Sequence, residues 1–508
     1  MKNFKILLVH ELQQQSKSFI FVLMMAVALL TAFICGYIQV DDFAERQAVY
    51  REELRTGQAQ QKEALAYSQF AVPVLIAPNP MSIFYRGVDE SIGNKSMISP
   101  VRLPDLESTS QRRNPFLAMF ANLDISGIVK ILSIFVLLLA AGIIPGERET
   151  RIWHLIFANS VKGFAYYLAK FCATGISALL SLSVLFFVAG ILAAVHPMVE
   201  TAGAFWMRLG LTFLASFLYL SVFATLGLAV SARSQHAGAS VLWGVLVWIG
   251  ISFIYPNLIG TLADRPLDAE NRLAVREIKN IEEECVREFS SLKKWHGLDM
   301  MHLPFARYFD SNIPEQRLLT RSEMEAVISM SEKGVLENEL ANWERLWPIL
   351  WKYQQGIQDQ KDRMRQKQLG QQRSHQSLTC FLPDMLYEQS LASLAGTGIE
   401  YRDEYLRGEL RRFRGQVFDY LEGKKAFGEK FFTLFPRDQW RDSWDDYTAS
   451  EREIYGDFEK QENYPRLSTT DAPVFAFAEK FDFPAGLPVL LGVNVLLFVA
   501  GLGWFQKR

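Results

Sequence analysis

Charged residues are spread unevenly along the chain, so that stretches free of charge alternate with stretches in which charges recur every few positions. A helix rising about 1.5 Å per residue needs roughly 20 apolar residues to cross the hydrocarbon core of a membrane. Six stretches meet this requirement, at residues 18–40, 125–144, 171–195, 209–232, 237–262 and 483–506. They predict an α-helical integral membrane protein with six transmembrane helices.

Two details of these stretches bear on their interpretation. The run at 18–40 is longer than the apolar region of a signal peptide, and Ile38-Gln39-Val40 lacks the small residues of a cleavage site, so we interpret it as a retained span. Lys130 is the one charged residue inside a predicted span. Its ammonium group either reaches back to the membrane surface or contributes to a substrate path.

Lys and Arg set the predicted orientation. The segments on one side of the membrane would be 1–17, 145–170, 233–236 and 507–508, and together they carry ten Lys/Arg and three Glu. Cytoplasmic segments of membrane proteins carry such an excess of cations. We therefore expect both chain ends in the cytoplasm, with 41–124 and 263–482 outside it. These two outer segments are mildly acidic, which argues against binding to nucleic acid.

The outer segments are predicted to form two domains. In the first, 41–70 continues the first span as a helical stalk, and 73–115, rich in Pro, Ser and Asn with extended pieces, is predicted to be an irregular or mixed α/β cap. The second is predicted to be mostly helical, because apolar residues recur among charges over long polar stretches. Pro348 should kink or restart one of these helices.

The sequence offers little catalytic chemistry. It contains no G-x-x-x-x-G-K-[ST] loop, so this chain is expected to be no ATPase and to hold no cofactor of its own. A weak candidate for a metal site is a cluster of soft ligands in the second outer segment, formed by His296, Met300, Met301 and His302. The alternative is a loop with buried thioethers and two surface imidazoles. Cys285 and Cys380 are the two cysteines predicted outside the membrane, where a disulfide between them is possible.

The most informative segment lies between the second and third spans. It begins Pro145-Gly-Glu-Arg-Glu-Thr-Arg-Ile-Trp-His-Leu, continues with apolar residues to Asn159, and reaches Lys170 at the entrance to the next span. Here the chain resembles the ATP-binding-cassette (ABC) type-2 permeases, whose loop reads G-E-[KR]-E-x-G-T-L, then S-N-P-[VL], then Lys. Four departures from this pattern are Arg151 for Gly, Ile152 for Thr, Trp153 for Leu and Ser160 for Pro.

A second stretch strengthens the resemblance. Leu382-Pro-Asp-Met-Leu, Leu394-Ala-Gly-Thr-Gly and Tyr405 are similar to the region before the last span in the permeases with large outer insertions. That subgroup is often labelled multicopper-enzyme-maturation-type permeases. Six spans with insertions after the first and the fifth extend the similarity over nearly the whole chain.

The resemblance implies a permease subunit of an ABC transporter, an exporter, driven by a separate cytosolic ATPase that binds ATP and Mg²⁺ and docks on the loop. The residues it implies for this coupling are Gly146, Glu147, Arg148, Glu149, Arg151, Trp153, Asn159 and Lys170. The segment 1–17 would be an interfacial helix. A second permease, identical or related, would complete the transporter in a bacterial cytoplasmic membrane. The alternative is a scaffold that transports nothing and transmits movement through its outer domains to an envelope partner.

Overall fold

The computed structural model describes most of the chain. The described residues are 2–64, 67, 70–87, 94–100, 124–159, 161–263, 268–290, 335–379, 382–398, 406–427, 446, 448–449, 467–475 and 483–506. In this part of the chain the structure is almost entirely helical, with one two-stranded sheet.

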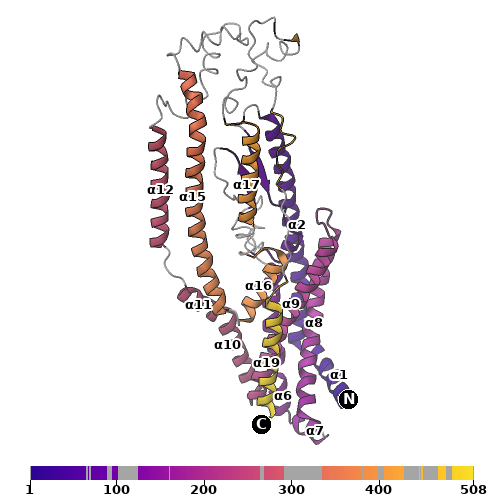
Figure 1. The fold of residues 1–508 in the computed structure, drawn as a ribbon. Coiled ribbons are helices and arrows are strands. Elements are labelled where there is room, and N and C mark those ends of the chain that lie inside the picture. Colours follow the sequence, from indigo (N-terminus) through magenta and orange to yellow (C-terminus); the bar gives the residue numbers. More distant parts are fainter. Residues whose placement is uncertain are drawn as a thin grey trace.

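Six helical segments in the described residues are long and apolar enough to cross a membrane, which confirms the predicted fold class. They form one bundle in the lower half of Figure 1. The segments are α2 (Phe19–Glu63), α5 (Ile125–Ala141) with α6 (Ile143–Glu149), α8 (Gly163–Val195), α9 (Gly203–Arg233), α10 (Ala237–Ile249) with the π-helical turn η3 (Gly250–Ile254) and α11 (Tyr255–Ala263), and α19 (Gly486–Gln506).

Helix α9 lies at the centre of the bundle, and 67% of its most apolar stretch is buried. Helix α10 and its continuation lie at the periphery, where 11% of the corresponding stretch is buried. Small residues let the neighbours of α5 approach it closely. A Cβ at Gly227 of α9 would lie 2.7 Å from the Leu137 carbonyl oxygen, and one at Gly244 of α10 would lie 2.6 Å from Leu137 Cδ2. These contacts fix the positions of α9 and α10 on α5.

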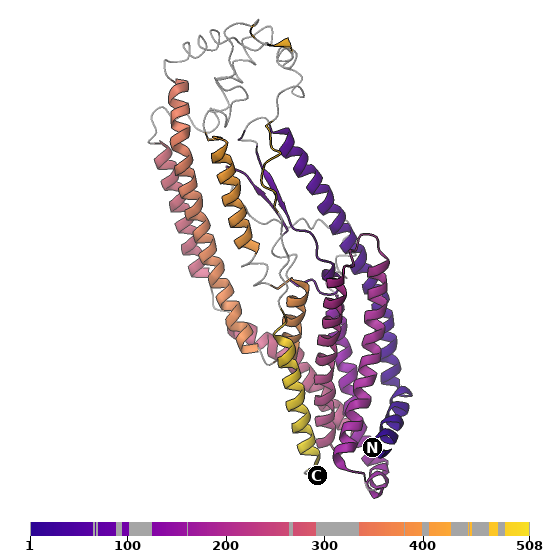
Figure 2. The same cartoon turned by 45° about the vertical axis from the view of Figure 1, so that its right-hand side comes forward.

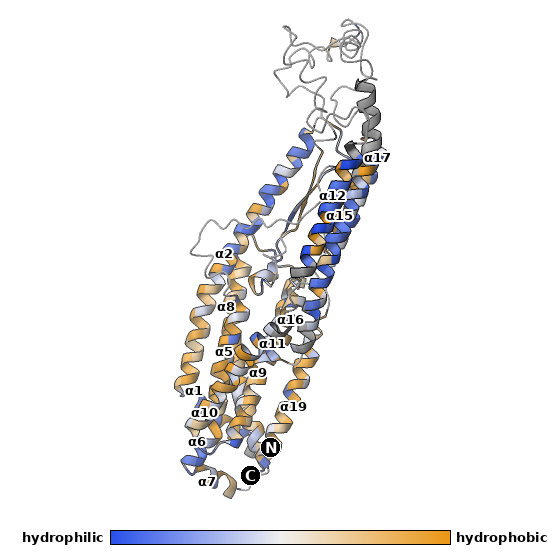
Figure 3. Cartoon of the chain, turned by 90° about the vertical axis from the view of Figure 1, so that its left-hand side faces the viewer, coloured by the Kyte–Doolittle hydropathy of each residue, from blue (hydrophilic) through white to orange (hydrophobic). Residues whose placement is uncertain are grey.

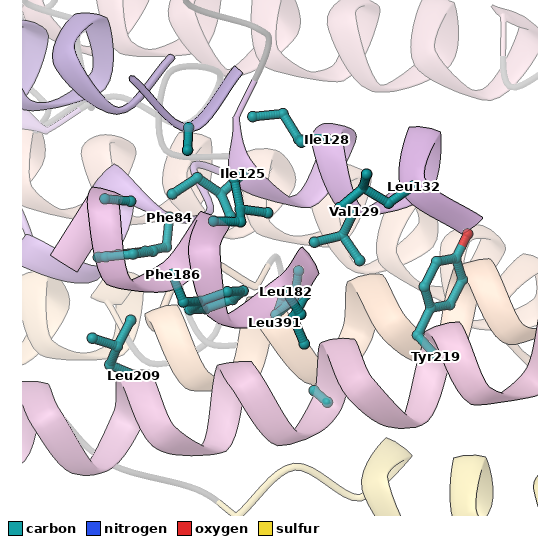
Figure 4. Close-up of a cluster of buried hydrophobic side chains, with 14 of the residues drawn as sticks. Phe84, Ile125, Ile128, Val129, Leu132, Leu182, Phe186, Leu209, Tyr219 and Leu391 are labelled. Atoms are coloured by element: carbon teal, nitrogen blue, oxygen red, sulfur yellow. The ribbon is translucent and has the colours of Figure 1, made fainter. Parts of the chain in front are cut away.

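The core of the bundle contains residues from outside the spans. In Figure 4, Phe84 and Leu391 lie among side chains of α5, α8 and α9, including Ile128, Leu182 and Phe186. Phe84 follows the short 3₁₀ helix η2 (Pro80–Ile83), and Leu391 belongs to α16 (Pro383–Ala395). Each inserted segment thus contributes to the end of the bundle that lies beneath it.

The described parts of the two insertions form a single unit beyond the bundle, which we call the head module: residues 41–64, 70–76, 94–98, 268–290, 335–379, 406–427 and 467–475. Val72, Val74 and Ile98 of the first insertion share a hydrophobic core with Leu410 and Phe413 of the second. The two domains expected from the sequence therefore meet in one core here. Figure 3 shows the change from apolar spans to a polar head along α2.

The sheet in the head module consists of β1 (Val72–Leu75) and β2 (Lys95–Ile98), paired antiparallel with Val72 opposite Ile98. Helix α2 supports it, because Lys95 forms an ion pair with Glu53 (3.0 Å) and a Cβ at Gly57 would lie 2.8 Å from Pro73. The glycine in this helix therefore allows the sheet to lie against it.

The second insertion contributes three long helices to the head module, α12 (Asp268–Ser290), α15 (Val335–Thr379) and α17 (Leu406–Gly423), which lie alongside one another in Figure 2. Trp351 of α15 packs on Phe418 of α17, with ring centroids 4.3 Å apart, and Arg414 lies over the same indole at 4.8 Å. Helix α15 continues through Pro348, so no new helix begins there, contrary to one of the two expected effects of this proline.

Helix α16 belongs to the bundle rather than to the head module. The Tyr219 hydroxyl of α9 donates to Asp384 (2.5 Å), and the hydroxyls of Ser216 and Tyr387 are 2.9 Å apart. Lys130 forms an ion pair with Glu388 of α16. The sequence allowed two roles for Lys130, reaching back to the membrane surface or contributing to a substrate path. These polar groups pair within the apolar bundle, where an unpaired one would be costly.

Candidate functional site

The predicted coupling loop folds into two short helices at the end of the bundle opposite the head module (Figure 1). Helix α6 (Ile143–Glu149) continues α5, and α7 (Ile152–Ala158) turns away from it; residues 143–159 are called the elbow below. The turn is made at Arg151, whose φ of 61° is left-handed. Arg151 stands where the permease pattern has glycine, the residue that adopts this conformation without steric strain.

A buried charge cluster anchors the elbow. Lys170 of α8 is 1% exposed and its ammonium group bridges two carboxylates, Glu147 of α6 and Glu11 of α1 (Lys2–Ser16). The other carboxylate oxygen of Glu147 accepts a hydrogen bond from the Tyr166 hydroxyl. One cation thus joins three helices, and its burial makes each bond matter, because an uncompensated buried charge is strongly destabilising.

Helix α1 is fixed along α8 by amide and hydroxyl bonds one turn further along from Glu11. Gln15 donates to Thr174 Oγ1 (3.2 Å) and accepts from Ser177 Oγ (2.7 Å). Burial raises the pKa of Glu11, and the neighbouring negative charge of Glu147 raises it further. The positive charge of Lys170 lowers this pKa but does not offset the two. Glu11 therefore binds a proton more readily than a solvated glutamate does.

Two charged residues join α6 to the hairpin of α9 and α10. Arg148 donates to the carbonyl oxygen of Ser234 (3.0 Å), and Glu149 accepts from the backbone N–H of Ala237 (2.9 Å), the first residue of α10. An acidic side chain at a helix N-terminus satisfies an orphan donor and complements the helix dipole. Movement of α6 therefore acts directly on the start of α10.

Aromatic rings hold α7 against the bundle. The indole of Trp153 lies 4.7 Å from Phe157, 5.3 Å from Tyr166 and 5.5 Å from Phe505 of α19, measured between ring centroids. The Arg148 guanidinium lies 4.7 Å from the same indole, in cation–π geometry. Trp153 is half-buried in this cluster, so it serves as the inner anchor of the elbow.

The opposite face of α7 is exposed. Leu155 is 67% exposed and Ile152 40%, and Arg151, His154 and Asn159 lie in the open beside them. Exposed apolar side chains of this kind can contact either a partner protein or the membrane surface. We refer to Arg151, Ile152, His154, Leu155 and Asn159 as the elbow face.

The structure thus divides the eight coupling residues by position. Arg151 and Asn159 lie on the elbow face, and a Cβ at Gly146 would meet nothing within 4 Å, so this glycine is open to the outside. Those that bind within the bundle instead are Glu147, Arg148, Glu149, Trp153 and Lys170. Glu147 in particular is only 4% exposed, which makes it an internal support of the elbow.

Three residues of the site were missed by sequence reasoning. Tyr166 and Phe505 are ordinary aromatic residues near the ends of spans, and nothing in the pattern brings them together. Glu11 does carry a signal, since it is the single acidic residue in 1–17 and lies in an otherwise uncharged stretch between Lys5 and Lys17. A lone carboxylate in such a stretch, if it is buried, needs a cationic partner.

The other candidate sites lie wholly or partly outside the described residues. His296, Met300, Met301 and His302 lie outside the described residues, and within the described ranges no three His, Cys, Asp or Glu side chains gather as a metal site would require. Cys285 lies on α12, while Cys380 lies outside the described residues, so their pairing stays a prediction.

Comparison with known protein families matches residues 6–398 to the family described as ABC-2 family transporter protein. Among curated proteins, none matches the chain. The family match includes α1 from residue 6 on, the elbow, five of the six spans and α16, and it ends before α17 and α19.

Proposed function

Since the chain belongs to the ABC-2 transporter family and is a permease component of an ABC transporter, we propose that a separate cytosolic ATPase docks on the elbow face and drives export through this subunit. ATP and Mg²⁺ are bound by that partner. The observation that carries the proposal is the arrangement of α7, which presents exposed Leu155 and Ile152 outward while its inner face is fastened to the bundle.

The elbow is bonded to several helices of the bundle, so a force on the elbow is transmitted to them. Glu147 is bound to Lys170 and Tyr166 of α8, and Lys170 to Glu11 of α1, so that displacement of α6 is felt by both helices. Arg148 and Glu149 tie the same helix to the α9–α10 hairpin. Short charge-assisted bonds of this kind are stiff connections in a buried setting. An ATPase that moves α7 would therefore move several spans together.

The proposed orientation places the elbow and α1 in the cytoplasm of a bacterium and the head module outside its cytoplasmic membrane. The excess of Lys and Arg at the elbow end supports this orientation. A second permease, identical or related, completes the translocation unit. Helix α10 is little buried and exposes the apolar side chains of Leu242, Trp243 and Leu246. This face can contact the second permease or lipid.

The test is to purify tagged full-length chain from its native membranes, identify an associated ABC ATPase by mass spectrometry, and measure its affinity and hydrolysis in reconstituted complex. Leu155→Glu should weaken association at least tenfold, because it places a charge in the docking face. Val474→Glu is the matched control, since Val474 is 77% exposed in the head module. Equal affinity of both variants would refute docking at the elbow face.

One observation favours the alternative function as a scaffold that transmits movement. Helix α2 runs unbroken from Phe19 to Glu63, so the same rigid element crosses the membrane and supports the head module. In that case nucleotide would displace the head module in proteoliposomes without release of any solute. Spin-label distances within the head module, recorded with and without ATP alongside a solute-efflux assay, separate the two functions.

A further inference from the structure

The ring of Phe505, at the elbow end of α19, lies in a cage of aromatic side chains. It stacks on Tyr166 at 5.5 Å with the rings 15° from parallel, and it meets Trp153 edge-on at 5.5 Å and Tyr167 at 5.7 Å. Phe505 is 6% exposed, although it is one residue from the end of its helix. Its three partners belong to α7 and α8, so this ring joins the last span to the elbow.

Helix α7 depends on such contacts for its position. It has seven residues, none of them buried, and no side chain caps its N-terminus. An isolated helix of this length is unstable in water, so its stability comes from packing. The packing is supplied by Trp153 and Phe157, which contact Tyr166, and by Trp153, which contacts Phe505.

The location of Phe505 is in turn set by close contacts along α19. A Cβ at Gly501 would lie 2.2 Å from Tyr167 Oη, so a larger residue there would have to displace the Tyr167 side chain of α8. Asn494 accepts from Ser221 Oγ (2.8 Å) and donates to the Leu218 carbonyl oxygen (2.9 Å), which fixes the register of α19 on α9. A shift of α19 relative to α8 is therefore transmitted to the ring of Phe505.

We propose that Phe505 is a positioning residue for the elbow: it holds α7 in the orientation that presents the elbow face, and it couples that orientation to the last span. The proposal rests on the proposed function of the elbow face as an ATPase docking site. It goes beyond the family match, which ends at residue 398, more than a hundred residues before Phe505.

The first experiment uses the full chain alone, in lipid nanodiscs, and measures hydrogen–deuterium exchange of the amides in α7. Phe505→Ala should raise exchange over residues 152–158 about tenfold, as loss of its ring contacts predicts. Phe505→Tyr keeps the ring and should stay within about twofold of wild type. Trp504→Ala is the matched control, because the neighbouring Trp504 is 48% exposed and absent from the cage.

Exchange over α9 reports whether the bundle itself is intact. If Phe505→Ala also loosens α9, then Phe505→Leu, which keeps apolar volume without the ring, decides: faster exchange in α7 with protected α9 supports the proposal. Equal α7 exchange in the Phe505 variants and in Trp504→Ala would overturn it.

The second experiment adds the associated ATPase. Phe505→Ala should raise the ATPase concentration needed for half-maximal association about fivefold and leave the hydrolysis rate at saturation unchanged, with Phe505→Tyr restoring the affinity. Failure of wild-type chain to bind any ATPase would refute the proposed function while leaving the exchange result unaffected. Failure of Phe505→Ala to alter either measurement would refute only the positioning role.

Discussion

Arg151 shows what one residue in an unfavourable conformation implies. Its φ of 61° places a β-carbon where an L-residue is strained by about 1–2 kcal/mol. Arg151→Gly should therefore stabilise the turn between α6 and α7 by up to about 1 kcal/mol. Slower exchange of the α7 amides and a higher midpoint of thermal unfolding in detergent would show it. Unchanged exchange would mean that Arg151 is stabilised by other contacts.

Gly146 allows the docking proposal to be separated from folding. Because a Cβ there meets nothing within 4 Å and α6 is helical, Gly146→Ala should leave the chain as stable or up to about 1 kcal/mol more stable. The same change should weaken ATPase association if the partner approaches this helix closely. A variant that folds and binds like wild type would place the contact further along the elbow.

The buried cluster predicts a large effect for Lys170. Lys170→Met leaves Glu11 and Glu147 buried without their cation and should cost about 3–5 kcal/mol of unfolding free energy. Lys162→Met is the control, because Lys162 is exposed at the start of the same helix. Denaturation of both variants in matched micelles measures the difference. Similar stability of the two variants would show that the cluster contributes little to the free energy of unfolding.

Glu11 gives that cluster a dependence on pH. Its pKa is raised in the folded chain, so the folded state binds a proton more tightly than the unfolded state does. The resulting stability is fully present below the ordinary glutamate pKa and is lost as the pH rises through the raised value. Glu11→Gln should remove this fall in stability, whereas Glu147→Gln, which removes a like charge beside Glu11 and also disturbs Tyr166, should diminish it and destabilise more. Thermal unfolding from pH 4 upward tests both.

At the scale of elements, the spans could be predicted well and their ends poorly. Loss of charge marks where a helix enters hydrocarbon, but α8 begins at Gly163 and α9 at Gly203, ahead of the uncharged runs predicted from 171 and 209. The predicted continuation of the first span as a stalk is confirmed, because α2 runs to Glu63. Pro348 does not end α15, and Trp351, three residues further on, packs on Phe418 of α17. Helix α16 could not be assigned to the bundle, because its burial depends on partners such as Tyr219 and Ser216 that are distant in sequence.

Contacts between helices predict the effect of small side chains. Gly227→Ala should force α9 from α5 and destabilise the bundle by about 1–3 kcal/mol, because its Cβ would lie 2.7 Å from backbone. Gly210→Ala in the same helix meets nothing within 4 Å and serves as the control. Thermal unfolding of the two variants in one detergent compares them directly. Equal midpoints would contradict the close packing of α9 on α5.

At the scale of the whole molecule, orientation is the property most open to test. In a background without native cysteines, Ala158→Cys on α7 should react with an impermeant thiol reagent only after cells are permeabilised. Val474→Cys in the head module should react in intact cells, because its side chain is exposed. The reverse pattern would overturn the proposed topology and with it the docking of a cytosolic partner.

The candidate site was only partly foreseeable at this scale. The pattern from Gly146 to Lys170 located the elbow, because the loop is contiguous in sequence. Its supports come from α1, α8 and α19, which are separated from one another by up to several hundred residues. The sequence pattern therefore located the loop. The residues that support the loop, such as Glu11 and Phe505, could be recognised only from the folded structure.

The unbroken length of α2 has a mechanical consequence. Its 45 residues span about 68 Å at about 1.5 Å per residue. Treated as a lever pivoting at its base, a rod of this length converts a tilt of about 5° into a sweep of about 6 Å at its tip. A small tilt at the elbow end would thus displace the tip of α2 in the head module by more than the pitch of one helical turn. Because α2 is a single continuous helix, no break within it would absorb this movement.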